Sequence, residues 1–341
     1  MDLERPTYMS DLTGHLGDAE KATDFLQPKP WTEHWSESET YYFNFFIPSR
    51  KLDGLVYLKI RPNLRTCHSG VFTFSGVKRH HLQAEHFNFQ QFLPFPEVSG
   101  NTLHVPEIDL TVTIVEPLTR HRIDYSDPRS GTELHFVTEA ISPPAMRGNN
   151  AHFDQVMQTN GTLLLLGEEL EIDCVQVRDR SWGEPRPESP LRHPPTAWCT
   201  GASADGTVAF TFSGADDPAR DAGLETYGIP ARDLFKDGWF WSHGSLKKIV
   251  RMSKLTQRHS SGLRPETIDC RFTDETGAEH HVRGSVESGL LWSPWPNMAL
   301  TYGCHFRWDL ELPDGTLAEL RGEAQEIYWH DSVRQLLTAE I

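Results

Sequence analysis

The chain consists of short segments in which apolar and polar residues alternate, separated by glycine, proline, aspartate and asparagine. Alternation of this kind places every second side chain on one face, as in a strand with one buried face. The segments recur about every eight to twelve residues, a spacing typical of a β-barrel or β-sandwich. The clearest are 54–60, 71–75, 110–115, 133–137, 162–166, 207–212 and 247–250. The pattern therefore predicts an all-β, antiparallel protein.

Turn signals join several of these segments into hairpins. These turns lie at 127–131, 274–277 and 313–315. Helical periodicity is scarce, so only a few short helices are expected. They are expected at 82–92, at 216–224 and after residue 332.

The length of 341 residues indicates two domains at roughly 150 residues each. A run with two prolines and Gly-Asn-Asn, at 142–150, interrupts the strand pattern and suggests a boundary. We therefore expect an N-terminal extension over 1–29, a first β domain over 30–146 and a second over 147–341. The sequence Phe-Thr-Phe-Ser-Gly occurs at 72–76 and again at 210–214. This echo fits either two similar domains in tandem or a chance match in a β-rich chain.

The charge balance, 32 basic against 48 acidic residues and a net charge of −16, argues against nucleic acid and anionic membranes as partners. The sequence contains no run of eighteen apolar residues, so it does not predict a membrane-spanning helix. The first residues, Met-Asp-Leu-Glu-Arg-Pro, do not resemble a secretory signal. Five scattered cysteines without a C-x-x-C pair fit reduced thiols. These features predict a cytoplasmic protein, and they leave its oligomeric state open.

Asp179 is the first candidate for chemistry. In a strand it shares a face with Val175 and Val177, whereas Arg180 and Trp182 lie on the opposite face. If the valines point inward, Asp179 enters an apolar interior, where a carboxylate must be paired or protonated. A carboxyl group of this kind has a shifted pKa and can act as a general acid or base. The alternative is an aspartate held by its neighbouring arginines at a strand end.

Two further acid–base candidates follow from strand periodicity. His152 and Asp154 share a face, and a histidine oriented by a carboxylate can shuttle protons. Gln155, the next residue, is a candidate for orienting a polar substrate group. The alternative is a histidine satisfied by backbone groups at a domain junction. Glu326 interrupts a row of small apolar residues near the C-terminus, which makes it a candidate interior acid.

The aromatic run containing Trp239, Trp241 and His243 has two interpretations. It forms either the wall of a pocket for an apolar ligand, with His243 as a polar contact, or ordinary barrel core. The seventeen histidines include clusters at 80–86 and 280–281, but neither has a known ligand spacing, so no metal is expected. Phosphate-binding glycine loops and the G-x-S-x-G motif are absent from the sequence, so no cofactor is expected either.

Several motifs together resemble the two-domain lipocalin-like proteins grouped with hydroxyneurosporene synthase (carotenoid 1,2-hydratase). The similarity extends roughly from residue 30 to residue 330. The motifs are Gly148–Gln155 with its His-Phe-Asp-Gln, the Arg-Asp-Arg-Ser-Trp-Gly of 178–183, Gly322–Glu326, Trp31-x-x-x-Trp35 and Arg61-Pro-Asn63. The resemblance implies two lipocalin-like antiparallel β-barrels with an apolar ligand pocket in or between them. On this chain it implicates His152, Asp154, Gln155, Asp179, Arg180, Trp182 and Glu326.

These observations predict a cofactor-independent lyase or isomerase, hydratase- or dehydratase-like, that acts on a hydrophobic terpenoid, steroid-like or aromatic small molecule. Asp179, or His152 with Asp154, would transfer the proton. Aromatic faces would exclude water and stabilise developing positive charge. Two alternatives remain: a lipocalin-like carrier or sensor without chemistry, and a hydrolase or C–C bond-cleaving enzyme that uses the same acid–base residues.

Overall fold

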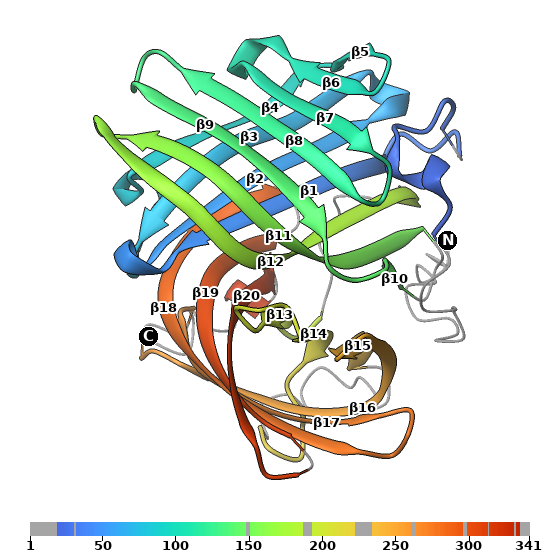
Figure 1. The fold of residues 1–341 in the computed structure, drawn as a ribbon, viewed down its shortest axis with the longest axis vertical. Helices are drawn as coiled ribbons and strands as arrows, with labels where there is room; N and C mark the ends of the chain where they lie inside the picture. The colour runs from blue at the N-terminus through green and yellow to red at the C-terminus, as the bar shows by residue number, and fades with distance from the viewer. Residues whose placement is uncertain are drawn as a thin grey trace.

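In a computed structural model, the protein is built almost wholly from antiparallel strands arranged as two units, a curled sheet and a closed barrel (Figure 1). The structure describes residues 19–30, 32–147, 151–186, 193–221, 234–260, 263–295, 299–312, 314–330 and 332–334. The predicted all-β class with two β units is confirmed.

The first unit is a 12-stranded sheet that curls into a half-barrel. Its path runs β4-β3-β2-β1-β12-β11-β9-β8-β7-β6-β5, and β10 pairs with β11. The strands are β1 (Glu37–Ile47), β2 (Leu52–Arg61), β3 (Thr66–Ser75), β4 (His86–Pro94), β5 (Glu97–Ser99), β6 (Thr102–Val105), β7 (Leu110–Glu116), β8 (Arg120–Asp127), β9 (Thr132–Ala140), β10 (Ala145–Met146), β11 (His152–Leu165) and β12 (Glu168–Pro185). Because the path ends at β4 and β5, which are not paired with each other, this sheet stays open.

The second unit is a closed barrel in which each strand pairs with its neighbour in sequence and β20 returns to β13. Its strands are β13 (Thr196–Ala202), β14 (Val208–Ala215), β15 (Phe235–Ser242), β16 (Ser245–Arg258), β17 (Pro265–Asp274), β18 (Glu279–Trp295), β19 (Ala299–Glu311) and β20 (Leu317–Trp329). Short 3₁₀ helices precede or connect strands in the first half. They are η1 (Lys21–Asp24), η2 (Pro48–Arg50), η3 (Pro62–Leu64), η4 (His81–Gln83) and η5 (Pro106–Ile108).

Strand alternation creates three apolar layers rather than two. One face of the sheet fills the half-barrel, and the barrel strands fill the barrel interior. The other face of the sheet packs against the outside of the barrel through a third, aromatic-rich cluster. Along β1, for example, Tyr41 faces the half-barrel and Tyr42 faces the barrel. We call the layer between the two units the junction; in Figure 1 it lies between β1, β11 and β12 above and the barrel below.

Some sequence-based expectations need correction. Residues 82–92 are not helical, because from His86 onward the chain pairs with β3 as strand β4. The echo at 72–76 and 210–214 does not occupy equivalent positions. Phe72 faces the junction, whereas Phe210 faces the barrel interior. The expected helix at 216–224 and the C-terminal tail lie partly outside the described residues, as do residues 1–18 of the expected extension, Trp31 and residues 148–150.

The expected division at 146/147 does not coincide with the change from sheet to barrel. Strands β11 and β12 follow residue 147, and both pair within the first sheet. The chain leaves that sheet after Pro185 and enters the barrel at Thr196. The Pro-Pro segment therefore marks a bend before a central hairpin of the sheet. In the described part of the chain, no helix has the length and apolar character needed to cross a membrane.

Candidate active site at the junction

His152, Asp154 and Asp179 meet at the junction, on the face of the sheet that is turned towards the barrel. Asp154 of β11 lies directly opposite Asp179 of β12, and His152 begins β11 two residues earlier. Their strand neighbours Val156 and Val177 belong to the apolar layer of the junction. The strand alternation predicted from sequence therefore brings these three candidates together, with an apolar layer beside them.

The contacts within this group are direct. His152 Nε2 bonds Asp179 Oδ2 and lies 3.9 Å from Asp154 Oδ1. Thr40 Oγ1 donates to Asp179 Oδ1 at 3.4 Å. The side chains of His152 and Asp179 are 16% and 17% exposed, whereas Asp154 is fully buried. The imidazole and one carboxylate are thus reachable from solvent, and the second carboxyl group lies behind them.

Two side chains of the barrel and one arginine complete the site. Trp239 of β15 donates its Nε1 proton to Asp154 Oδ2 at 3.1 Å. Arg147 forms two bonds with Asp237 of β15, at 2.9 Å and 2.5 Å. The Nη1 atom of Arg147 lies 3.5 Å from His152 Nε2 and 3.9 Å from Asp154 Oδ1. The sheet and the barrel therefore both contribute to the site.

The two facing carboxyl groups have opposite pKa shifts. Burial raises the pKa of Asp154 to about 6; Arg147 and His152 oppose this effect, and the negative charges of Asp179 and Asp237 add to it. Burial would also raise the pKa of Asp179, but the charge and hydrogen bond of His152, together with Arg147, hold it below its ordinary value. Two carboxyl groups this close cannot both ionise freely. Near neutral pH the site therefore holds an ionised Asp179 beside a more basic Asp154.

The same atoms offer a set of metal ligands that sequence spacing did not indicate. One ligand atom each from His152, Asp154 and Asp179 lies within 4.8 Å of the others. Imidazole and carboxylate groups suit several divalent ions. Arg147 already places a positive charge beside Asp154 Oδ1 and His152 Nε2. A divalent ion would therefore have to displace Arg147 in order to use these ligands.

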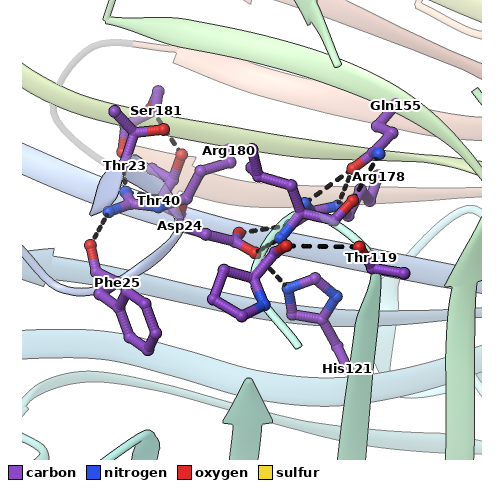
Figure 2. A network of polar contacts seen from close by, with 12 residues as sticks. Thr23, Asp24, Phe25, Thr40, Thr119, His121, Gln155, Arg178, Arg180 and Ser181 are labelled. Atoms are coloured by element: carbon purple, nitrogen blue, oxygen red, sulfur yellow. Dashed lines mark hydrogen bonds and ion pairs between the residues drawn. The ribbon is translucent and has the colours of Figure 1, made fainter. Parts of the chain in front are cut away.

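Gln155, Arg180 and Trp182 lie on the opposite face of the same two strands, inside the half-barrel. Gln155 Oε1 accepts two bonds from Arg178, and its amide donates to two backbone carbonyls. Arg180 donates to Glu39 at 2.7 Å and to the Phe25 carbonyl at 2.9 Å. Figure 2 shows part of this network, in which Arg178 bonds Asp24 and Gln155 and Arg180 bonds the carbonyl of Phe25. These side chains tie the N-terminal segment to the sheet.

The remaining candidates are not part of the junction cluster. Glu326 lies among core residues of the barrel, where Arg258 donates to it at 2.5 Å. Trp241 packs in the junction and donates to the Gly206 carbonyl at 3.0 Å. His243 is exposed in the turn after β15. Trp182 is buried against Phe153, with ring centroids 6.0 Å apart.

Comparisons with known proteins place the chain in a family and a fold. A family model described as a domain of unknown function, DUF7064, matches residues 21–316. The chain belongs to the DUF7064 family. No curated protein sequence matches it significantly.

Two solved structures are similar to this DUF7064 protein. One is a candidate AttH protein of Nitrosomonas europaea, with a TM-score of 0.56 and 14% identity, covering 85% of this chain and 92% of that one. The other is kievitone hydratase from Nectria haematococca, with a TM-score of 0.55 and 11% identity, covering 93% of this chain and 97% of that one. At these identities the likeness shows the fold, which is consistent with the lipocalin-like architecture expected from the sequence.

Sequence reasoning missed Arg147 and Asp237 in this DUF7064 protein. Asp237 precedes Trp239 by two residues on one strand, so strand alternation places it on the same face as Trp239, which the aromatic run had singled out. Arg147 carried no comparable signal, because it lies within the Pro-Pro run at 142–150, whose pattern indicates only a boundary. Its role depends on β10 pairing with β11, which no local pattern reveals.

Proposed function

We propose that this DUF7064 protein is a hydratase-like lyase that needs no organic cofactor and uses His152 and Asp179 for proton transfer. The observation that carries the proposal is the bond between His152 Nε2 and Asp179, two partly exposed groups at the junction. A carboxylate bonded to one imidazole nitrogen fixes the ring and stabilises its charged form. The other nitrogen, Nδ1, then remains available to take and return a proton.

The surroundings of Asp179 support catalysis over a purely structural role. The two arginines that flank Asp179 in sequence have other carboxylate partners, and Asp179 forms its ion pair with His152. Arg178 and Arg180 are bonded to Asp24 and Glu39 on the far face of the sheet. Asp179 is therefore not neutralised by its sequence neighbours, and its charge acts on His152.

This pair of groups is suited to adding water to a double bond or removing it. In hydration, one carbon of a polarised double bond takes the oxygen of water while the neighbouring carbon takes a proton. His152 accepts the proton that water loses and returns one to carbon, and Asp179 stabilises the imidazolium in between. Dehydration reverses both transfers. The likeness to kievitone hydratase supports this class over hydrolysis.

The junction also supports a hydrophobic, aromatic substrate class. Tyr42 is the strand neighbour of Asp179 and packs edge-on against Trp198 of the barrel, with ring centroids 5.6 Å apart. Trp239 adds a third ring whose N–H bonds Asp154. These rings are buried between the two units, so they make the surroundings of the acid–base groups apolar, which favours a hydrophobic, ring-bearing ligand with a few polar atoms.

The test uses kievitone and a small panel of prenylated and terpenoid alkenes, with mass spectrometry to detect gain or loss of one water. Asp179→Asn and His152→Ala are expected to lower turnover at least about a hundredfold, the usual scale of acid–base catalysis. Asp173→Asn is the matched control. It lies on the same strand and face, farther from the site, where it is exposed and accepts a bond from Gln158, and it should leave turnover unchanged.

Binding separates this proposal from the carrier alternative. Quenching of tryptophan fluorescence by the same compounds should persist in Asp179→Asn, because the aromatic surfaces remain. Binding without turnover in the unmutated protein across the panel would favour a carrier. Turnover that survives both Asp179→Asn and His152→Ala would remove these residues from the mechanism.

A further inference from the structure

Arg147 and Asp237 join the two units directly beside the acid–base residues. Arg147 follows β10 of the sheet, and Asp237 lies on β15 of the barrel. Arg147 Nε donates to Asp237 Oδ2 at 2.9 Å, and Nη2 donates to Oδ1 at 2.5 Å. This two-bond geometry fixes the plane of the guanidinium group. The side chains are 10% and 20% exposed, so the pair is better shielded from water than a surface ion pair.

The third nitrogen of the same guanidinium group points at the site. Arg147 Nη1 lies 3.9 Å from Asp154 Oδ1, an oxygen that is buried and has no hydrogen-bond partner in the described part of the chain. It also lies 3.5 Å from His152 Nε2. Because His152 Nε2 already bonds Asp179, Arg147 acts on these three side chains through its positive charge. That charge opposes protonation of both carboxyl groups.

Asp237 shares its strand face with Trp239, the donor to Asp154. The two residues are separated by one position on β15, so both point out of the barrel towards the sheet. One holds the guanidinium group that faces Asp154 Oδ1, and the other bonds Asp154 Oδ2. If the barrel moved away from the sheet, the site would lose both contacts at once.

We propose that Arg147 and Asp237 form a positioning pair, and that the acid–base site is complete only when the barrel is docked on the sheet. This inference rests on the proposed function of His152 and Asp179. Asp237 anchors Arg147, and Arg147 in turn holds its Nη1 atom against His152 Nε2 and Asp154 Oδ1, beside the bond from His152 to Asp179. Docking of the two units and the arrangement of the site are thereby coupled through a single side chain.

The first test follows the titration of Asp154 by ¹³C NMR in protein with labelled aspartate carboxyl carbons, assigned with Asp154→Asn. Removing the nearby positive charge in Arg147→Met should raise the midpoint of Asp154 by about one pH unit or more, the effect of losing an opposite charge at this range. Arg147→Lys should recover part of the shift, because it restores the charge without the two-bond geometry. Arg251→Met, at an exposed ion pair on β16, is the control and should leave Asp154 unchanged.

The second test is a double-mutant cycle on turnover. If Asp237 acts through Arg147, Asp237→Asn should lower kcat in the unmutated background and have little further effect in Arg147→Met. An Asp154 midpoint that stays unchanged in folded Arg147→Met, or additive losses in the cycle, would overturn the inference. The NMR titration needs no substrate. The inference can therefore fail while His152 and Asp179 remain essential. If instead the Asp154 midpoint moved as expected but His152 and Asp179 were dispensable for turnover, the proposed function would be wrong.

Discussion

Two clusters built from histidine, aspartate and arginine lie on opposite faces of the same strand pair, β11 and β12. The inner cluster contains Asp24, His121 and Arg178, and all three side chains are at most 2% exposed. The outer cluster contains His152 and Asp179, which are partly exposed, with Arg147 beside them. The two clusters contain almost the same residue types, but their aspartate oxygens differ in how many hydrogen bonds they accept.

In the inner cluster both oxygens of Asp24 are occupied. Oδ1 accepts from Arg178 at 2.8 Å, and Oδ2 accepts from His121 at 2.8 Å and from the Leu118 amide at 2.6 Å (Figure 2). Burial would raise the pKa of Asp24, but these partners hold it far below its ordinary range. In the outer cluster Asp154 keeps an unpartnered oxygen among the described residues, and its pKa is raised. The comparison shows that two clusters of nearly the same residue types differ in the hydrogen bonding of their aspartates, and with it in the direction of the aspartate pKa shift.

The largest expected difference between the two clusters is in the free energy of unfolding that is lost when the aspartate of each is replaced. Asp24→Asn leaves the buried guanidinium group of Arg178 without its carboxylate, which should lower the free energy of unfolding by about 3–5 kcal/mol. Asp179→Asn removes a partly exposed carboxylate but keeps an amide oxygen in its place, so it should cost less, about 1–2 kcal/mol. Urea denaturation of both variants measures the difference. Equal losses would mean that the outer cluster is as structural as the inner one.

The two clusters should also give opposite pH dependence of stability. The pKa of Asp24 is lowered on folding, so its contribution is present above the ordinary pKa of aspartate and is lost as the pH falls below about 4. The pKa of Asp154 is raised to about 6, so its contribution is full below about pH 4 and is lost as the pH rises to about 6. A shift of this size corresponds to about 3 kcal/mol.

Matched variants isolate these slopes. The unfolding free energy of the unmutated protein minus that of Asp154→Asn should fall as the pH rises from about 4 to about 6. The same difference for Asp24→Asn should fall as the pH drops below about 4. Asp53 and Glu323, a second buried pair at the junction, also have raised pKa values and add a slope of the same sign. Both variants retain that slope, so it cancels. A flat difference curve for Asp154→Asn would contradict the raised pKa.

The sequence predicted the outer cluster well because strand alternation is local. A period of two placed Asp179 with Val177 and His152 with Asp154, and the structure confirms both placements. The same rule placed Glu326 inside the barrel, and the barrel core surrounds it. The all-β class followed from the same signal.

Long-range pairing is the part that local patterns could not supply. Asp24 meets Arg178 across more than 150 positions of sequence, so the inner cluster was invisible and Arg180 and Gln155 were assigned to substrate instead. The end of the first unit was placed too early for the same reason. A Pro-Pro segment looks like a boundary unless it is known that β12 pairs with β1. Arg147 was missed because its partner lies on the other unit.

The smallest expected effect concerns the single hydrogen bond that the barrel gives to Asp154. Trp239→Phe keeps an aromatic ring but removes the N–H donor at 3.1 Å, so it should raise the Asp154 midpoint slightly; the lost bond should cost about 1 kcal/mol of stability, and the smaller ring adds the cost of a cavity. Trp241→Phe is the matched control on the same strand. It loses a bond to the Gly206 carbonyl and should cost a similar amount of stability without moving Asp154. If both variants moved the Asp154 midpoint equally, the shift would come from loosened packing of β15, and the bond from Trp239 would have no separate effect on the site.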